Sequence, residues 1–164
     1  MAAKHMIFFM QDDFDKEALL SQIVNDLALN IDELPEGFPC EFSAQKGNGR
    51  SYFLIEYSND IQGYIDELTL WERPGEKYKD MLRACSRTIS MHYRDPGNAR
   101  CFFFSLSTVL GQNASACLVE NGFGCLLGLQ DMIQQIASNP TWSWEKTSFP
   151  EIPGVADSEW GYLE

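Results

Sequence analysis

The sequence predicts an α+β fold: a mostly antiparallel sheet with three helices, in a single domain. The chain has 164 residues, a length that suits one domain. Glycine and asparagine between apolar stretches, at Gly47–Gly49 and Gly111–Asn113, predict two β-hairpins. Three other segments repeat apolar residues at helical spacing. Hairpins pair strands antiparallel, and helices packed on such a sheet give the α+β class.

The first half of the chain is predicted to contain a strand, a helix and a hairpin. The apolar run Ile7–Met10 predicts the first strand. Acidic residues and then apolar residues at helical spacing predict an amphipathic helix over residues 14–30. The first hairpin joins strands at Cys40–Ala44 and Arg50–Tyr57. Residues 61–71 fit either an edge strand or a short helix, and we favour the strand.

The second half is predicted to contain a helix, the second hairpin and a final helix. Residues 76–93 show helical spacing of apolar side chains after a proline-glycine break. Apolar, aromatic and β-branched residues at Cys101–Leu110 and Ser115–Glu120 predict the two strands of the hairpin. Residues 126–137 form the final helix, which ends at an Asn-Pro pair.

The predicted domain covers residues 6–164 and ends with an aromatic C-terminal segment, residues 141–164. Residues 1–5 are excluded, because the His-Met pair before the first strand resembles a vector-encoded leader. The expected core consists of apolar residues on the inner faces of the predicted elements: Leu20, Ile23, Val24, Leu27, Phe53, Ile55, Leu82, Ile89, Phe102, Phe104, Leu118, Leu129 and Ile133.

The charge balance restricts the classes of partner. The chain has 24 acidic and 12 basic residues, a formal net charge of −12. Nucleic acids and anionic membranes both attract cationic proteins, so neither is an expected partner. The longest apolar runs are far shorter than the about 20 residues of a transmembrane helix. An acidic surface instead favours a cationic protein partner.

The cysteines indicate a reducing compartment, and hence the cytoplasm. The chain has five cysteines, an odd number, and no Cys-x-x-Cys pair. A disulfide framework usually has an even count, and a zinc site usually has close pairs. We therefore expect five free thiols, and no metal ligand or cofactor is predicted.

Two motifs with catalytic or cofactor associations are better explained by structure. Cys85 and His92 are seven residues apart on the predicted helix, about 10 Å, too far for a hydrogen-bonded dyad. The glycines of Gly122–Gly128 have the spacing G-x-G-x-x-x-G, which departs from the dinucleotide-binding fingerprint. We interpret that segment as a bend between a strand and a helix, and we predict no catalytic residue.

Charges are unevenly distributed along the chain. Residues 12–72 carry 14 acids and three bases, whereas residues 73–100 carry three acids and seven bases. Lys79, Arg83 and Arg87 would form a basic stripe at i, i+4 and i+8 of the predicted helix. Such a stripe is usually solvated surface or a partner for nearby acids.

The predicted partner-binding surface combines acids with the aromatic C-terminal segment. Tryptophan often supplies the desolvated centre of an interface, and acids steer a cationic partner toward it. An alternative is that the C-terminal segment closes one side of the core. The predicted binding residues are Asp60, Asp66, Glu67, Glu72, Trp142, Trp144, Glu145, Glu159 and Trp160.

In size, acidity, cysteine usage and order of elements, the chain resembles the small acidic immunity proteins that bacteria make against their own secreted toxins. The resemblance implies a monomer or weak homodimer, not an enzyme, that occludes the active site of a cationic toxin domain such as a nuclease. The order of elements is also similar to that of acidic chaperones of type III secretion effectors, which are homodimers. A third alternative is an enzyme or small-ligand domain whose pocket includes Trp71, Cys85 and His92.

Overall fold

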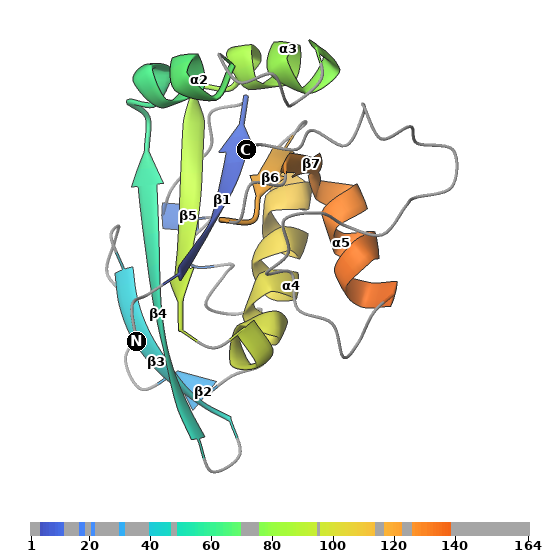
Figure 1. Ribbon diagram of the computed structural model, residues 1–164. Helices are drawn as coiled ribbons and strands as arrows, with labels where there is room; N and C mark the ends of the chain where they lie inside the picture. Colours follow the sequence, from blue (N-terminus) through green and yellow to red (C-terminus); the bar gives the residue numbers. More distant parts are fainter. Residues whose placement is uncertain are drawn as a thin grey trace.

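One antiparallel sheet of seven strands organises the part of the chain that the structure describes (Figure 1). The structure is a computed structural model that describes residues 4–11, 17–18, 21, 30–31, 40–46, 49–69, 76–94, 96–113, 117–122 and 126–138. The strands are β1 (Lys4–Met10), β2 (Asn30–Ile31), β3 (Cys40–Lys46), β4 (Gly49–Ser58), β5 (Arg87–Tyr93), β6 (Cys117–Glu120) and β7 (Leu126–Gly128). Their order across the sheet is β2-β3-β4-β5-β1-β6-β7, and each neighbouring pair is antiparallel.

Helices pack on both faces of this sheet. The described helices are α2 (Gln62–Thr69), α3 (Glu76–Ala84), α4 (Pro96–Asn113) and α5 (Leu129–Ser138). In Figure 1, α4 and α5 lie beside one face, and α2 and α3 lie across one end of the strands. The predicted α+β fold with an antiparallel sheet is therefore confirmed.

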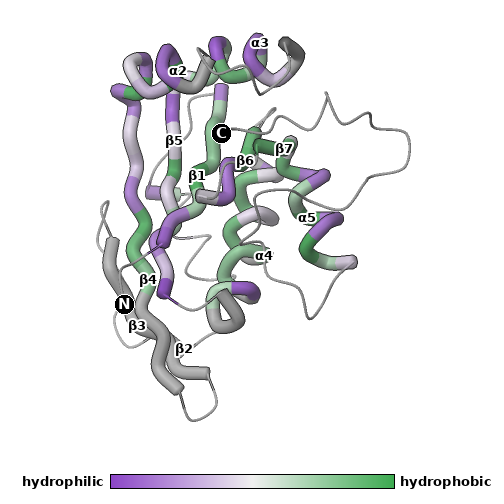
Figure 2. The backbone as a smooth tube through the Cα atoms, viewed as in Figure 1, coloured by the Kyte–Doolittle hydropathy of each residue, from purple (hydrophilic) through white to green (hydrophobic). Residues whose placement is uncertain are grey.

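The central strand β1 supplies side chains to two hydrophobic cores. Successive side chains of a strand point to opposite faces. Phe8 and Met10 accordingly belong to the larger cluster, with α4 and α5, whereas Phe9 belongs to a second cluster with α2 and α3. All three side chains are fully buried. Figure 2 shows the resulting hydrophobic colour along β1 and along α4.

The prediction of a strand at Cys101–Leu110 and a hairpin turn at Gly111–Asn113 is wrong, because these residues belong to the helix α4. Its buried positions recur every three or four residues, which is the spacing of one helix face. The apolar ones are Ala99, Phe102, Phe103, Leu106, Val109 and Leu110, and Ser107 is buried with them. Gly111 lies within the helix and faces α5: a methyl group on it would lie 3.7 Å from Gln130 Nε2. Only the second predicted strand, Ser115–Glu120, survives in part, as β6.

The prediction of a helix over residues 76–93 is half wrong. The helix α3 ends at Ala84, and the chain continues as β5 between β4 and β1. The apolar residues fit helical spacing, but burial within β5 follows the alternation of a strand at Ile89, Met91 and Tyr93.

Two further boundaries differ from the sequence analysis. Residues 61–71, for which we favoured a strand, contain the helix α2. Ile61 and Ile65 are buried one helical turn apart, and the Ile65 N–H donates to the Ile61 carbonyl oxygen at 2.9 Å. The segment predicted as the last helix begins with the short strand β7 and then forms α5.

The predictions of the first strand and the first hairpin are confirmed. The predicted strand at Ile7–Met10 lies within β1, and the strands at Cys40–Ala44 and Arg50–Tyr57 lie within β3 and β4. The expected core residues buried in the structure are Phe53, Ile55, Leu82, Ile89, Phe102, Leu118 and Leu129, and Phe104 and Ile133 are half-buried against the larger cluster.

The N-terminal segment gives a mixed result. Lys4 and His5, which the sequence analysis left out of the fold, extend β1 and lie opposite Tyr93 and His92. Of the predicted helix over residues 14–30, the structure describes helical residues at 17–18 and 21 and places Asn30 in β2. The expected core residues Leu20, Ile23, Val24 and Leu27 lie outside the described residues.

The turn after β6 depends on glycine. Gly122 has a φ of +82°, a left-handed conformation that residues with a Cβ adopt at a cost. A methyl group here would also overlap the backbone carbonyl oxygen of His5. The Gly122 N–H donates to Glu120 Oε1 at 2.9 Å, which fixes the turn.

We predict that Gly122→Ala lowers the free energy of unfolding by more than about 2 kcal/mol, because backbone strain and the overlap with β1 add together. Urea unfolding measures the change. Gly63→Ala is the matched control: Gly63 is exposed in α2, and outside the adjoining backbone of its own helix no described atom lies within 4 Å of the added carbon. It should leave stability unchanged or raise it by up to about 1 kcal/mol. Equal effects of the two substitutions would contradict the strain at Gly122.

Arg100 links α4 to the end of α5. Its Nη2 donates to the carbonyl oxygen of Ile136, which lies in the last turn of α5 and has no partner within that helix. The Arg100 guanidinium carbon lies 5.4 Å from the centre of the Phe104 ring. A cation at a helix C-terminus is favourable for the helix dipole.

We predict that Arg100→Met lowers the free energy of unfolding by about 1 kcal/mol, because the α5 carbonyl group loses a charged donor. Arg83→Met is the control for loss of an arginine, since Arg83 is exposed on α3 and its Nη1 pairs with the exposed carboxylate of Asp80 at 2.9 Å. That exposed pair should contribute less than about 0.5 kcal/mol. Thermal or urea unfolding of both variants decides whether Arg100 has this role.

Candidate functional site

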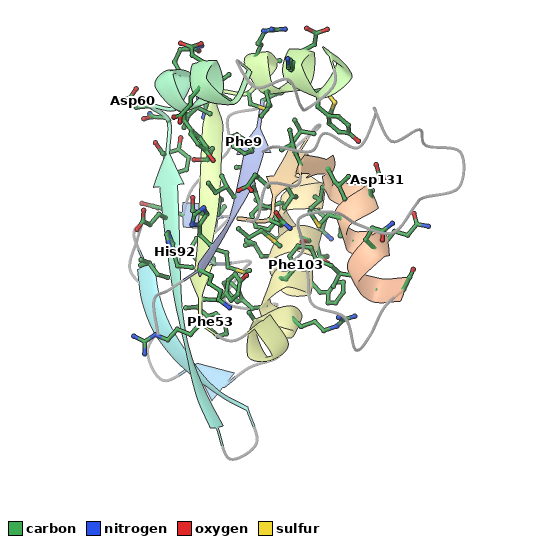
Figure 3. All side chains as sticks on the ribbon, viewed as in Figure 1. Phe9, Phe53, Asp60, His92, Phe103 and Asp131 are labelled. Carbon is green, nitrogen blue, oxygen red and sulfur yellow. The ribbon has the colours of Figure 1, made fainter. Side chains whose placement is uncertain are left out.

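Three predicted binding residues gather at one end of the sheet. Asp60 follows β4, and Asp66 and Glu67 lie on α2; all three side chains are exposed. The Asp60 N–H donates to Ser58 Oγ at 3.3 Å, and Gln62 Nε2 donates to Asp66 Oδ1 at 2.8 Å. We call Asp60, Asp66 and Glu67 the α2 acidic face. Figure 3 shows Asp60 at the outer end of β4, beside α2.

The opposite side of α2 anchors this surface to the sheet. Ile61 and Ile65 are buried in the second cluster. Tyr64 stacks on Phe9 of β1, with ring centroids 5.8 Å apart and an interplanar angle of 21°. Asp66 and Glu67 therefore lie on a helix whose position is fixed by packing, and Asp60 lies just before that helix.

A second polar group lies on the same face of the sheet as Phe9. His5 of β1 lies directly opposite His92 of β5, and their ring centroids are 6.0 Å apart. Glu56 of β4 reaches His92 diagonally, with 3.7 Å between His92 Nε2 and Glu56 Oε1. We call His5, His92 and Glu56 the histidine row. The three residues come from three neighbouring strands, so only the folded sheet brings them together.

Burial and the two neighbours act on His92 in different directions. Loss of water around the ring lowers the pKa of His92, the carboxylate of Glu56 raises it, and His5 lowers it further. The net effect is a pKa below 6.5. His92 is therefore mostly neutral at pH 7, when its contact with Glu56 is not an ion pair.

Glu120 of β6 is a buried carboxylate on the same face of the sheet. Glu120 is only 5% exposed, and it lies opposite Ile7 of β1. Burial raises the pKa of Tyr64 to about 12, and the negative charges of Glu120 and Glu67 contribute to the shift. The Tyr64 phenol therefore stays protonated at any pH near neutrality and can donate a hydrogen bond.

Cys85 and His92 lie on separate elements. Cys85 follows α3, and its thiol donates to the Met81 carbonyl oxygen at 3.2 Å. Cys85 lies before the start of β5 at Arg87, and His92 lies five residues further along that strand, about 16 Å from Arg87 in an extended chain. Cys85 and His92 are therefore too far apart for a hydrogen-bonded dyad, as the sequence predicted.

The predicted basic stripe is wrong, because the helix that would carry it is interrupted. Lys79 and Arg83 lie on α3, whereas Arg87 is the first residue of β5. Arg83 pairs with Asp80 at 2.9 Å, and Arg87 Nη1 donates to Ser86 Oγ at 2.6 Å. The three side chains therefore do not form one helical row.

The predicted binding surface is represented only by the α2 acidic face. The other predicted binding residues lie outside the described residues: Glu72, Trp142, Trp144, Glu145, Glu159 and Trp160. Sequence reasoning missed the histidine row, because it placed His92 on a helix and His5 in a leader. The signal that would have found it is the alternation Thr88, Ser90, His92, which places polar side chains on one face of a strand.

The comparisons with known proteins give no match: no family model, curated protein or solved structure is similar to this chain. Within the described ranges, no group of three or more His, Cys, Asp or Glu residues is placed to hold a metal ion. No helix in the described part of the chain has the length and apolar character needed to cross a membrane.

We predict that Cys85 reacts very slowly with thiol reagents in the native protein. Burial raises the pKa of its thiol to about 12, so about one thiol in ten thousand is ionised at pH 8. Alkylation by iodoacetamide, followed by peptide mass spectrometry, measures its rate before and after denaturation in urea. Rapid native labelling of Cys85 would contradict its burial, and the urea sample controls for access to the reagent.

Proposed function

We propose that this protein is an immunity protein that acts in the cytoplasm of the producing bacterium. It binds a cationic secreted toxin domain and neutralises it by occluding the toxin's active site. The observation that carries the proposal is the α2 acidic face on a chain with a formal net charge of −12.

Two physical properties of the α2 acidic face support this function. Its carboxylates are exposed, so they can attract a basic surface over a distance of about 10 Å at moderate salt. Its helix is anchored through Ile61 and Ile65, so little conformational entropy is lost when a partner binds. Carboxylates in this position can take the place of substrate phosphates in the active site of a nuclease.

Co-expression tests the proposal directly. Products of the genes adjacent to this one are expressed singly in a bacterial host, with and without this protein. We expect one neighbouring product to arrest growth and this protein to restore it. A set of neighbours that includes no toxic product, or a toxic product that this protein does not counteract, would contradict the immunity function.

We predict that the combined substitutions Asp60→Asn, Asp66→Asn and Glu67→Gln slow association with that toxic product by about tenfold or more, and weaken the dependence of the association rate on salt. The reason is the loss of steering by three exposed charges. Stopped-flow or surface-based kinetics across a salt series measures both effects.

The matched control removes three acids elsewhere on the described surface, by Glu17→Gln, Asp80→Asn and Asp131→Asn. Figure 3 shows Asp131 on α5, well away from Asp60. If both triple variants slow association equally, net charge rather than the α2 acidic face steers the partner.

A further inference from the structure

The histidine row places one titratable ring between two others on adjacent strands. His92 is on β5, with His5 beside it on β1 and Glu56 beside it on β4. The ring centroids of the two histidines are 6.0 Å apart, and His92 Nε2 is 3.7 Å from Glu56 Oε1. The side chain of His92 is 27% exposed, so its ring is partly withdrawn from water.

The described surroundings of His92 contain few other charges on this face of the sheet. Along β5, the neighbouring side chain on the same face is Ser90, which is uncharged. Glu120 of β6 lies on the same face beyond β1, opposite Ile7 rather than His5. Arg94, which follows β5, is exposed. Among described side chains, His5 and Glu56 are therefore the charged groups that meet His92 from its two neighbouring strands.

We propose that the histidine row is an acid-sensitive device in the fold: protonation of His92 weakens the folded state, and His5 and Glu56 set how strongly it does so. The inference does not depend on the proposed function. A protonated His92 carries its positive charge in a half-buried position beside a second histidine, which is unfavourable. The carboxylate of Glu56 offsets this cost only in part. His5 lies in the segment predicted as a leader. His92 and Glu56 lie outside that segment, so their contact is present whether or not residues 1–5 are a leader.

The sign follows from the direction of the shift. Burial and His5 together outweigh Glu56, so the pKa of His92 in the folded protein is below 6.5, its ordinary value in the unfolded chain. Between those two values the unfolded chain binds more protons than the folded one. Stability is therefore fully present above pH 6.5 and is lost as the pH falls from there to the folded pKa of His92.

Nuclear magnetic resonance of the imidazole C–H groups measures the titration of His92 in the full chain. We expect a midpoint below pH 6.5 in the unmodified protein. Glu56→Gln should move the midpoint to lower pH, because it removes the attraction, and His5→Gln should move it to higher pH, because it removes the repulsion. Asp131→Asn, which removes a carboxylate on α5 outside the histidine row, should leave it unchanged.

Urea unfolding at pH 7.5 and pH 5.5 connects the titration to the fold. We expect His92→Gln to lose less stability between these two pH values than the unmodified chain, and Glu56→Gln to lose more. A His92 midpoint at or above 6.5, shifts of the same sign in the Glu56 and His5 variants, or equal loss of stability with and without His92 would overturn the proposal. The titration requires no substitution at His92, so a poorly folded His92 variant does not remove the test.

Discussion

The two-sided burial of β1 is the constraint on which the rest of this structure depends. β1 is hydrogen-bonded to β5 on one side and to β6 on the other, and its side chains enter both hydrophobic clusters. Its partners lie about 80 and 110 residues later in the chain. The sheet is therefore completed only when distant segments meet. Whether β5 and β6 form strands depends on their pairing with β1.

This constraint explains why local sequence patterns predicted the first hairpin but not the middle of the chain. The hairpin β3–β4 is specified by its own strands and turn residues, so no distant contact is needed to identify it. For β5, the same apolar residues fit a helix and a strand. A long-range contact decides between them, because Ile89 of β5 pairs with Phe8 of β1. No local window contains that information.

The aromatic residues of α4 show the reverse case, in which a local pattern typical of a strand lies in a helix. Phe102 and Phe103 both point into the larger cluster, with Phe102 stacked on Phe53 and Phe103 stacked on Phe8. Adjacent aromatic residues favour a strand by propensity, but on a strand they would face opposite sides of the sheet. A helix lets both contact one face, and the need to cover that face overrides the local preference.

The fold also determines where some of the many acidic residues gather on the surface. The second cluster lies at one end of its face of the sheet, and α2 must bury Ile61 and Ile65 there. Its other side then faces solvent, and the acids Asp66 and Glu67 occupy that side, next to Asp60. The sequence predicted these three residues from their charge and from their position in or beside residues 61–71. Their common location follows from packing, because α2 carries Asp66 and Glu67, begins just after Asp60, and is positioned by its contact with Phe9 of β1.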